Sequence, residues 1–186
     1  MKPICIAILS LFLAAAAPPV RFLVPDGGFA GAAEEYRRLW DDEGNRIVAA
    51  LERETGLTFP DAPIDVIVSD GRPMTSYDGR LIRLRASYSP LYKKATLVHE
   101  LGHRLALALP HPRGMDDHKL LYLFLYDVWT DLYGRPFADR MVSIERRIAD
   151  HYDLAWSWAL RQTREERQAT LRALVAGSQS GLRVHG

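Results

Sequence analysis

A strongly apolar segment between Ser89 and Pro110 constrains the fold more than any other feature of the sequence. Ser89 is a favourable N-cap, Pro90 suits the first position of a helix, and Pro110 cannot continue one. These signals predict a helix from Pro90 to Leu109, about 20 residues or about 30 Å long. Because apolar residues surround this helix on nearly all sides, we expect it to be buried in the core.

The middle of this helix carries the polar sequence His99-Glu100-Leu101-Gly102-His103. Residues four apart share one helical face, so the two imidazoles can converge on a single ion. Glu100 lies beside that face, where it can accept a proton from water. The alternative is that both histidines hydrogen-bond within the core and bind nothing. Because unpaired polar groups are costly to bury, we favour a divalent metal site.

The segment that follows supplies candidates for a third metal ligand. A helix is predicted from Asp117 to Tyr133, and the short loop before it makes the two helices antiparallel neighbours. When the residues of the two antiparallel helices are paired outward from the loop, His99 lies at the same height as Asp127. By the same matching, His118 lies roughly 7 Å along the axis beyond His103. Asp127 is therefore the predicted third ligand, and His118 is the alternative.

A second aspartate lies one helical turn after Asp127. Asp131 could accept a hydrogen bond from the outer ring N–H of His99 and thereby fix its tautomer. The alternative for Asp131 is an ion pair with Arg135, four residues later. Asp116 fits the N-cap of the second helix better than it fits a metal ligand.

The remaining elements indicate the fold class. The sequence predicts a helix at 32–54, strands at 64–68 and 81–85, and further helices at 137–161 and 164–176. Because the strands precede a run of helices, we predict an α+β protein. We expect a short sheet packed on the motif helix, followed by a helical C-terminal half.

The first 17 residues have the pattern of a secretory signal peptide. Lys2 precedes an apolar run, which ends in small residues before Pro18-Pro19. The alternative is an uncleaved anchor. We therefore expect an exported protein, periplasmic or secreted, with a single domain at 18–186. Because the only cysteine, Cys5, lies in the signal segment, that domain must bind metal through His, Asp and Glu.

Charge composition bears on the partners. Lys plus Arg number 24 and Asp plus Glu number 23, a net charge of +1. This near-neutral charge does not predict a basic surface for binding nucleic acid. No membrane contact is expected beyond the N-terminal segment. No Gly-x-Ser-x-Gly elbow occurs, which disfavours a serine hydrolase. The sequence does not specify an oligomeric state.

The motif and the downstream aspartates together resemble a known arrangement. The sequence His99-Glu100-x-x-His103, followed by Asp127-x-x-x-Asp131, is similar to that of the gluzincins, zinc metallopeptidases of the zincin type. That family normally has Glu as the third ligand and an Asp one turn later that supports a zinc histidine. Here Asp replaces Glu at 127, as in the aspzincins, whose Gly-Thr-x-Asp-x-x-Tyr-Gly signature is absent.

The resemblance covers residues 81–134 and implies a function. It implies Zn²⁺ as the cofactor, a peptide or protein as the substrate, and Glu100 as the general base. It also implies that the strand at 81–87 binds extended substrate; the alternative is a plain edge strand protected by its arginines.

The family stabilises the oxyanion with a Tyr or a His, for which Tyr126, Tyr152 and His151 are candidates. Two other functions stay open. One is a catalytically silent metal-binding or scaffold protein. The other is a zinc amidase that acts on a non-protein amide.

Overall fold

The structure is a computed structural model, and it describes residues 17–182. All but the last residue of the predicted signal peptide, Cys5 included, lies outside the described residues. No helix in the described part of the chain is both long enough and apolar enough to cross a membrane.

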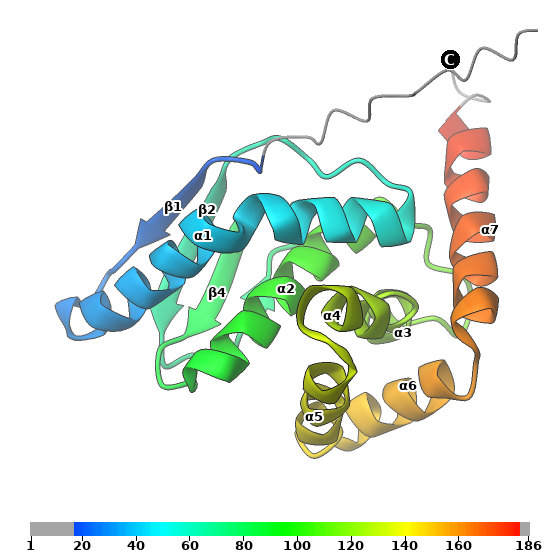
Figure 1. The fold of residues 1–186 in the computed structure, drawn as a ribbon. Coiled ribbons are helices and arrows are strands. Elements are labelled where there is room, and N and C mark those ends of the chain that lie inside the picture. The colour runs from blue at the N-terminus through cyan, green and yellow to red at the C-terminus, as the bar shows by residue number, and fades with distance from the viewer. Residues whose placement is uncertain (1–16, 183–186) are drawn as a thin grey trace, which may run out of the picture.

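The N-terminal half of the fold contains a small mixed sheet (Figure 1). Its strands lie in the order β1-β2-β4-β3, with β1, β2 and β4 parallel and β3 antiparallel to β4. The side chains of β2 alternate between buried and half-buried, as expected for a strand with one face in the core. The predicted strands β2 and β4 are confirmed, whereas β1 and β3 were not predicted. The strand bounds are β1 Val20–Leu23, β2 Ile64–Ser69, β3 Met74–Thr75 and β4 Leu81–Arg85.

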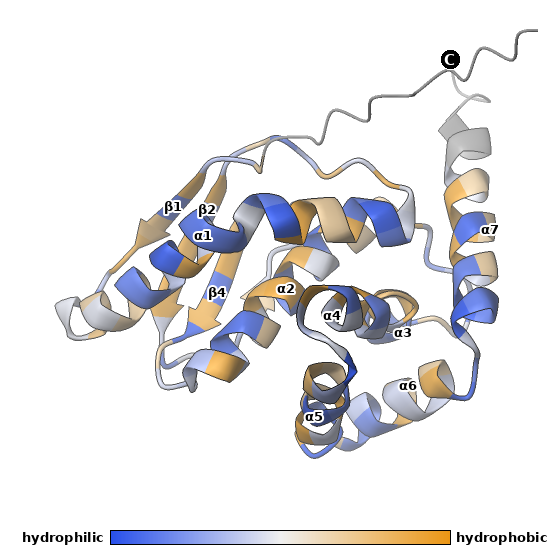
Figure 2. Cartoon of the chain, in the orientation of Figure 1, coloured by the Kyte–Doolittle hydropathy of each residue, from blue (hydrophilic) through white to orange (hydrophobic). Residues whose placement is uncertain are grey.

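Two long helices, α1 (Ala30–Thr55) and α2 (Pro90–Ala106), pack beside this sheet. Gly56 ends α1 in the left-handed conformation, with a φ of 68°. Ser89 caps α2 by accepting a hydrogen bond from the amide of Tyr92, as predicted. In Figure 2, α1 shows mainly hydrophilic residues to the viewer and the strands behind it are largely hydrophobic, which is typical of a helix that covers a sheet.

The C-terminal half is helical, so the α+β prediction is confirmed. The helices are α3 Asp117–Tyr122, α4 Leu125–Tyr133, α5 Arg135–Glu145, α6 Asp150–Leu160 and α7 Arg164–Leu182, and a single turn of 3₁₀ helix, η1 Gly27–Phe29, precedes α1. Helices α3 and α4 lie in front of α2 in Figure 1, and α7 runs along the edge of the molecule.

The predicted helix from Asp117 to Tyr133 is divided in two. The backbone leaves the helical region at Phe124, with φ −134° and ψ −22°. Leu123 and Phe124 are both buried in the core. Core packing therefore outweighs local helical propensity here. The predicted helix at 137–161 is likewise divided, into α5 and α6.

Gly102 allows α3 to pack closely against α2. A Cβ atom at this position would lie only 2.6 Å from Cδ1 of Leu121, which is fully buried in α3. A residue with a side chain would therefore push the two helices apart. This close approach brings the start of α3 to the middle of α2.

Candidate metal centre

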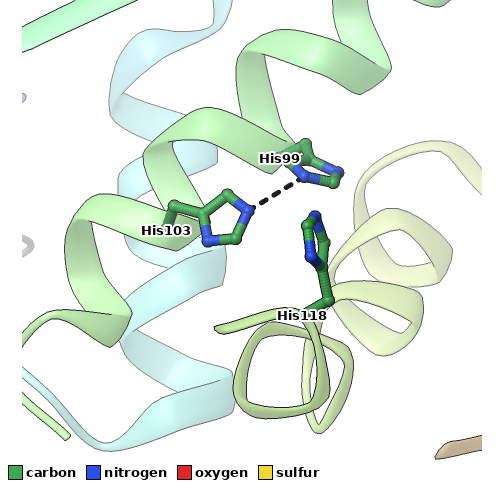
Figure 3. A group of neighbouring side chains, drawn as sticks. All are labelled: His99, His103 and His118. Atoms are coloured by element: carbon green, nitrogen blue, oxygen red, sulfur yellow. Dashed lines mark hydrogen bonds between the residues drawn. The ribbon is translucent and has the colours of Figure 1, made fainter. Parts of the chain in front are cut away.

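His99 and His103 point toward each other from one face of α2 (Figure 3). Their Nε2 atoms are 3.1 Å apart. Both rings line a cavity, and His99 is buried whereas His103 is half-buried. The structure therefore brings together the two histidines of the motif, as the sequence predicts.

His118 completes a group of three histidines. It lies on the first turn of α3, and its ring centroid is 5.7 Å from that of His99 and 5.1 Å from that of His103. One ring nitrogen from each histidine lies within 4.8 Å of the other two. Within residues 17–182, no other group of three or more potential metal ligands is this compact. Figure 3 shows the three rings facing a common point.

Glu145, at the end of α5, fixes the orientation of His99. Nδ1 of His99 lies 2.8 Å from Oε1 of Glu145, and both side chains are buried. Oε2 of Glu145 accepts hydrogen bonds from the hydroxyl of Tyr122 at 3.0 Å and from Nε1 of Trp156 at 2.9 Å. Because an ionised carboxylate only accepts, His99 carries its proton on Nδ1 and directs the lone pair of Nε2 toward His103.

The surroundings keep two of the three imidazoles neutral, which is the form that binds metal. Burial, followed by the proximity of His99, lowers the pKa of His103 well below its usual value. The same two causes lower the pKa of His118 to about 4. Burial alone would lower the pKa of His99 too, but the facing Glu145 carboxylate outweighs it and raises the pKa.

Glu100 is held beside the three histidines by Thr75. The hydroxyl of Thr75, on β3, donates to Oε2 of Glu100 at 2.8 Å. It also lies 2.9 Å from the main-chain oxygen of Glu100. Burial raises the pKa of Glu100, and the neighbouring His99 partly offsets the rise. A carboxylate with a raised pKa is a better proton acceptor than an exposed one.

Two cavities meet at this site. The larger, of about 270 Å³, is lined by five of the six histidines in the chain. The smaller, of about 90 Å³, extends from the same site toward Tyr88, Tyr92 and Ile148. Both cavities reach His99 and Glu100, so a molecule in either one lies against the candidate metal ligands and the candidate base.

The structure separates the three candidates for an oxyanion stabiliser. Tyr126 donates to Asp139 and lines neither cavity. Tyr152 and His151 line both. The Tyr152 hydroxyl has no hydrogen-bond partner among the described residues. Burial and the charge of Glu145 raise the pKa of Tyr152 to about 12. Tyr152 therefore keeps its proton at neutral pH and can donate it in a hydrogen bond.

The predicted position of Asp127 is wrong. The break at Phe124 reorients α4, and Asp127 faces α7 instead of the histidines. Its carboxylate accepts from Nη2 of Arg167 at 2.7 and 2.9 Å, and both side chains are buried. The alternative ligand, His118, occupies the place that was assigned to Asp127.

The predicted contact between Asp131 and His99 is wrong as well. Asp131 pairs with Arg164 of α7 at 3.3 Å and with Arg53 of α1 at 3.5 Å. The alternative partner, Arg135, pairs instead with Asp139. Asp116 caps α3 by accepting from the amide of Lys119, as predicted.

The edge strand beside the site is β3. The sequence predicts β4 in that place. β4 lies inside the sheet, between β2 and β3, whereas β3 is the terminal strand. Met74 and Thr75 of β3 line the larger cavity, whereas no residue of β4 lines either cavity. The strand at 81–87 is therefore not the edge beside the site.

The donor set fits a zinc ion. Three imidazole nitrogens with an open fourth position are a common catalytic zinc site, and the carboxylate behind His99 is a usual companion of such a ligand. In tetrahedral zinc sites two nitrogens lie about 3.3 Å apart, close to the 3.1 Å between His99 and His103. All three ligand nitrogens lie within 4.8 Å of one another, so the widest pair would have to move closer to bind one ion.

Sequence reasoning missed Glu145 and Thr75. Glu145 is 46 residues from His99 and carries no motif. Thr75 lies in a strand of only two residues. The only signal for Glu145 is its charge on an otherwise apolar face of a predicted helix, with Met141 and Val142 buried beside it.

No family model, curated protein or solved structure matches this chain.

Proposed function

We propose that this chain is a zinc-dependent hydrolase that cleaves peptide bonds. His99, His103 and His118 hold the metal, and Glu100 is the general base. The observation that carries the proposal is the convergence of three imidazole nitrogens within 4.8 Å, on a cavity that Glu100 also lines. Asp127 is not part of this site.

The protein supplies the orientation and the proton acceptor. A zinc ion held here would polarise a substrate carbonyl and lower the pKa of a coordinated water toward about 7. Glu145 keeps Nε2 of His99 free to bind the metal. Thr75 holds one oxygen of Glu100, which leaves the other free to accept a proton. Glu100 then delivers that proton to the leaving amine.

Tyr152 is the oxyanion donor in this proposal. Its hydroxyl is protonated at neutral pH, and Tyr152 lines both cavities. A hydrogen bond from Tyr152 to the developing oxyanion stabilises the transition state more than the neutral carbonyl of the substrate. His151, beside it, is exposed and is the second donor that reaches the site.

The experiment combines metal analysis with a peptide assay. The purified chain is dialysed, loaded with Zn²⁺ and incubated with a mixture of synthetic peptides, whose cleavage is followed by mass spectrometry. We expect one zinc ion per chain, cleavage that stops with a chelator, and recovery when zinc is added back. Glu100→Gln should bind zinc as the wild type does and cleave no faster than the chelated protein, because it lacks the proton acceptor.

His111→Ala is the matched control. His111 lines the larger cavity but does not belong to the group of three histidines, so its replacement should leave the zinc content unchanged. Full activity of Glu100→Gln would remove Glu100 from the mechanism. Zinc binding without cleavage of any peptide would contradict the hydrolase and favour a metal-binding protein.

A further inference from the structure

Exposed apolar side chains gather around the two cavities. Among the described residues, seven large hydrophobic side chains are exposed, and four of them line a cavity. Met74, Tyr77 and Leu107 border the larger cavity, and Ile148 borders the smaller one. Single exposed apolar residues are common, but a group around a cavity marks a binding site for an apolar ligand.

These four residues come from three separate parts of the chain. Met74 and Tyr77 lie in and just after β3, Leu107 follows α2, and Ile148 lies between α5 and α6. Local sequence pattern therefore cannot account for their convergence. The fold brings them together around the candidate metal centre, on both sides of it.

The two cavities are two sides of one cleft. They share six lining residues, which include His99, Glu100 and Tyr152. A chain molecule that lies across these shared residues enters the larger cavity on one side and the smaller cavity on the other. The bond placed against Glu100 then lies between the two parts of the ligand that fill the cavities.

The cavities differ in size and in their walls. The larger, of about 270 Å³, has flexible or exposed side chains at its border, with Tyr77 96% exposed. The smaller, of about 90 Å³, is enclosed by Tyr88 and Tyr92, whose ring centroids are 4.4 Å apart, and by Ile148 and Ala149. An aromatic side chain fits the first cavity, whereas the second has room for a short aliphatic one.

Arg72 disfavours a basic side chain of a ligand in its neighbourhood. Arg72 lines both cavities, is exposed, and has no ion pair or hydrogen bond with any described side chain. Of the three carboxylates on the walls, Glu145 pairs with His99, Asp117 pairs with His111, and Glu100 accepts a hydrogen bond from Thr75. A lysine of a ligand would therefore meet an uncompensated guanidinium at the junction of the cavities.

We propose that the substrate is an extended polypeptide segment with apolar side chains on both sides of the cleaved bond. A large side chain lies in the larger cavity and a short aliphatic one in the smaller. Basic side chains are disfavoured beside Arg72, where the two cavities meet. This inference rests on the proposed function, because it takes the shared residues as the place where the bond is cleaved.

Binding is measured apart from cleavage. Zinc-loaded Glu100→Gln is titrated into fluorescein-labelled peptides of one length, and fluorescence anisotropy is followed. The central pair of residues is Phe-Ala, Ala-Phe or Lys-Lys. We expect one of the two Phe peptides to bind at least about 10-fold more tightly than the other, because only one order matches the two cavities. Lys-Lys should bind more weakly than both.

Three variants locate the effect. Ile148→Ser should weaken binding of the preferred peptide several-fold, and Ala149→Phe should weaken it further by filling the smaller cavity. Leu154→Ser is the matched control, because Leu154 is exposed but lines neither cavity. Equal binding of all three peptides would overturn the inference. An equal effect of Ile148→Ser and Leu154→Ser would overturn it too.

The wild-type cleavage assay separates the two proposals. Cleavage of the three peptides at equal rates would overturn the inference and leave the proposed hydrolase intact. Selective binding by Glu100→Gln, with no cleavage by the zinc-loaded wild type, would support the cleft as a site for apolar polypeptide and contradict the hydrolase.

Discussion

Glu145→Ala is expected to weaken zinc binding by about 10- to 100-fold, the usual effect of removing the acceptor behind a metal-binding histidine. Without Glu145, Nδ1 of His99 has no acceptor, so the ring is free to rotate and to change tautomer. The affinity is measured by competition with a chromophoric chelator. Zinc affinity equal to that of the wild type would contradict the role of Glu145.

The same substitution should also destabilise the fold. It leaves the hydroxyl of Tyr122 and the indole N–H of Trp156 buried without their acceptor. Each buried unsatisfied group costs about 1–3 kcal/mol. The free energy of unfolding in urea, measured on the metal-free protein, should therefore fall by several kcal/mol.

Glu145→Gln separates the two effects. Its amide oxygen can still accept from Tyr122 and Trp156, so most of the stability should return. The side chain has lost its charge and gained a donor, so it holds the His99 imidazole less firmly. We expect zinc affinity to remain below that of the wild type. If both variants lost stability and both kept the zinc affinity of the wild type, Glu145 would be a purely structural residue.

Asp127→Ala is expected to lower the free energy of unfolding by about 3–5 kcal/mol, as for other buried ion pairs that lose one partner. The remaining Arg167 is 4% exposed, and its guanidinium would be buried without its carboxylate. The measurement is urea unfolding at neutral pH. Because this buried pair joins α7 to α4, loss of helical signal from α7 should accompany the change.

Asp131→Ala is the control for this prediction. Asp131 pairs with Arg164 at 3.3 Å, but both side chains are partly exposed. Exposed ion pairs contribute about 0–1 kcal/mol, so this variant should be little affected. An equal loss of stability in the two variants would contradict the account of the buried pair.

Local signals were enough for the elements around the motif. The cap at Ser89 and the apolar pattern after it predicted the start of α2 correctly. The β-branched run after Pro63 predicted β2. In each of these cases the signal lies within a few residues of the feature it predicts, so no knowledge of the tertiary fold is needed.

The parts of the site that depend on tertiary packing were not predicted. The pattern from Asp117 to Tyr133 favours one continuous helix, and on such a helix Asp127 would face His99. Burial of Leu123 and Phe124 breaks the helix, and no local signal marks the break. The helix-pairing geometry that ranked Asp127 above His118 therefore used the wrong backbone.

The ion pairs show the same limit. Asp131 has a partner at the favourable spacing of four residues, Arg135, yet it binds Arg164, which lies 33 residues away in sequence. His99 likewise takes its acceptor from α5 and not from the neighbouring α4. Sequence identifies the residue types that need partners, whereas the fold decides which partners they have.

The zinc content of two variants, His118→Ala and Asp127→Ala, tests the central claim most directly. Both proteins and the wild type are equilibrated with the same free zinc concentration, and bound metal is measured by atomic spectrometry. We expect Asp127→Ala to bind one zinc ion per chain, as the wild type does, and His118→Ala to lose most of its zinc. Full zinc content in His118→Ala, together with loss of zinc from Asp127→Ala, would contradict that claim.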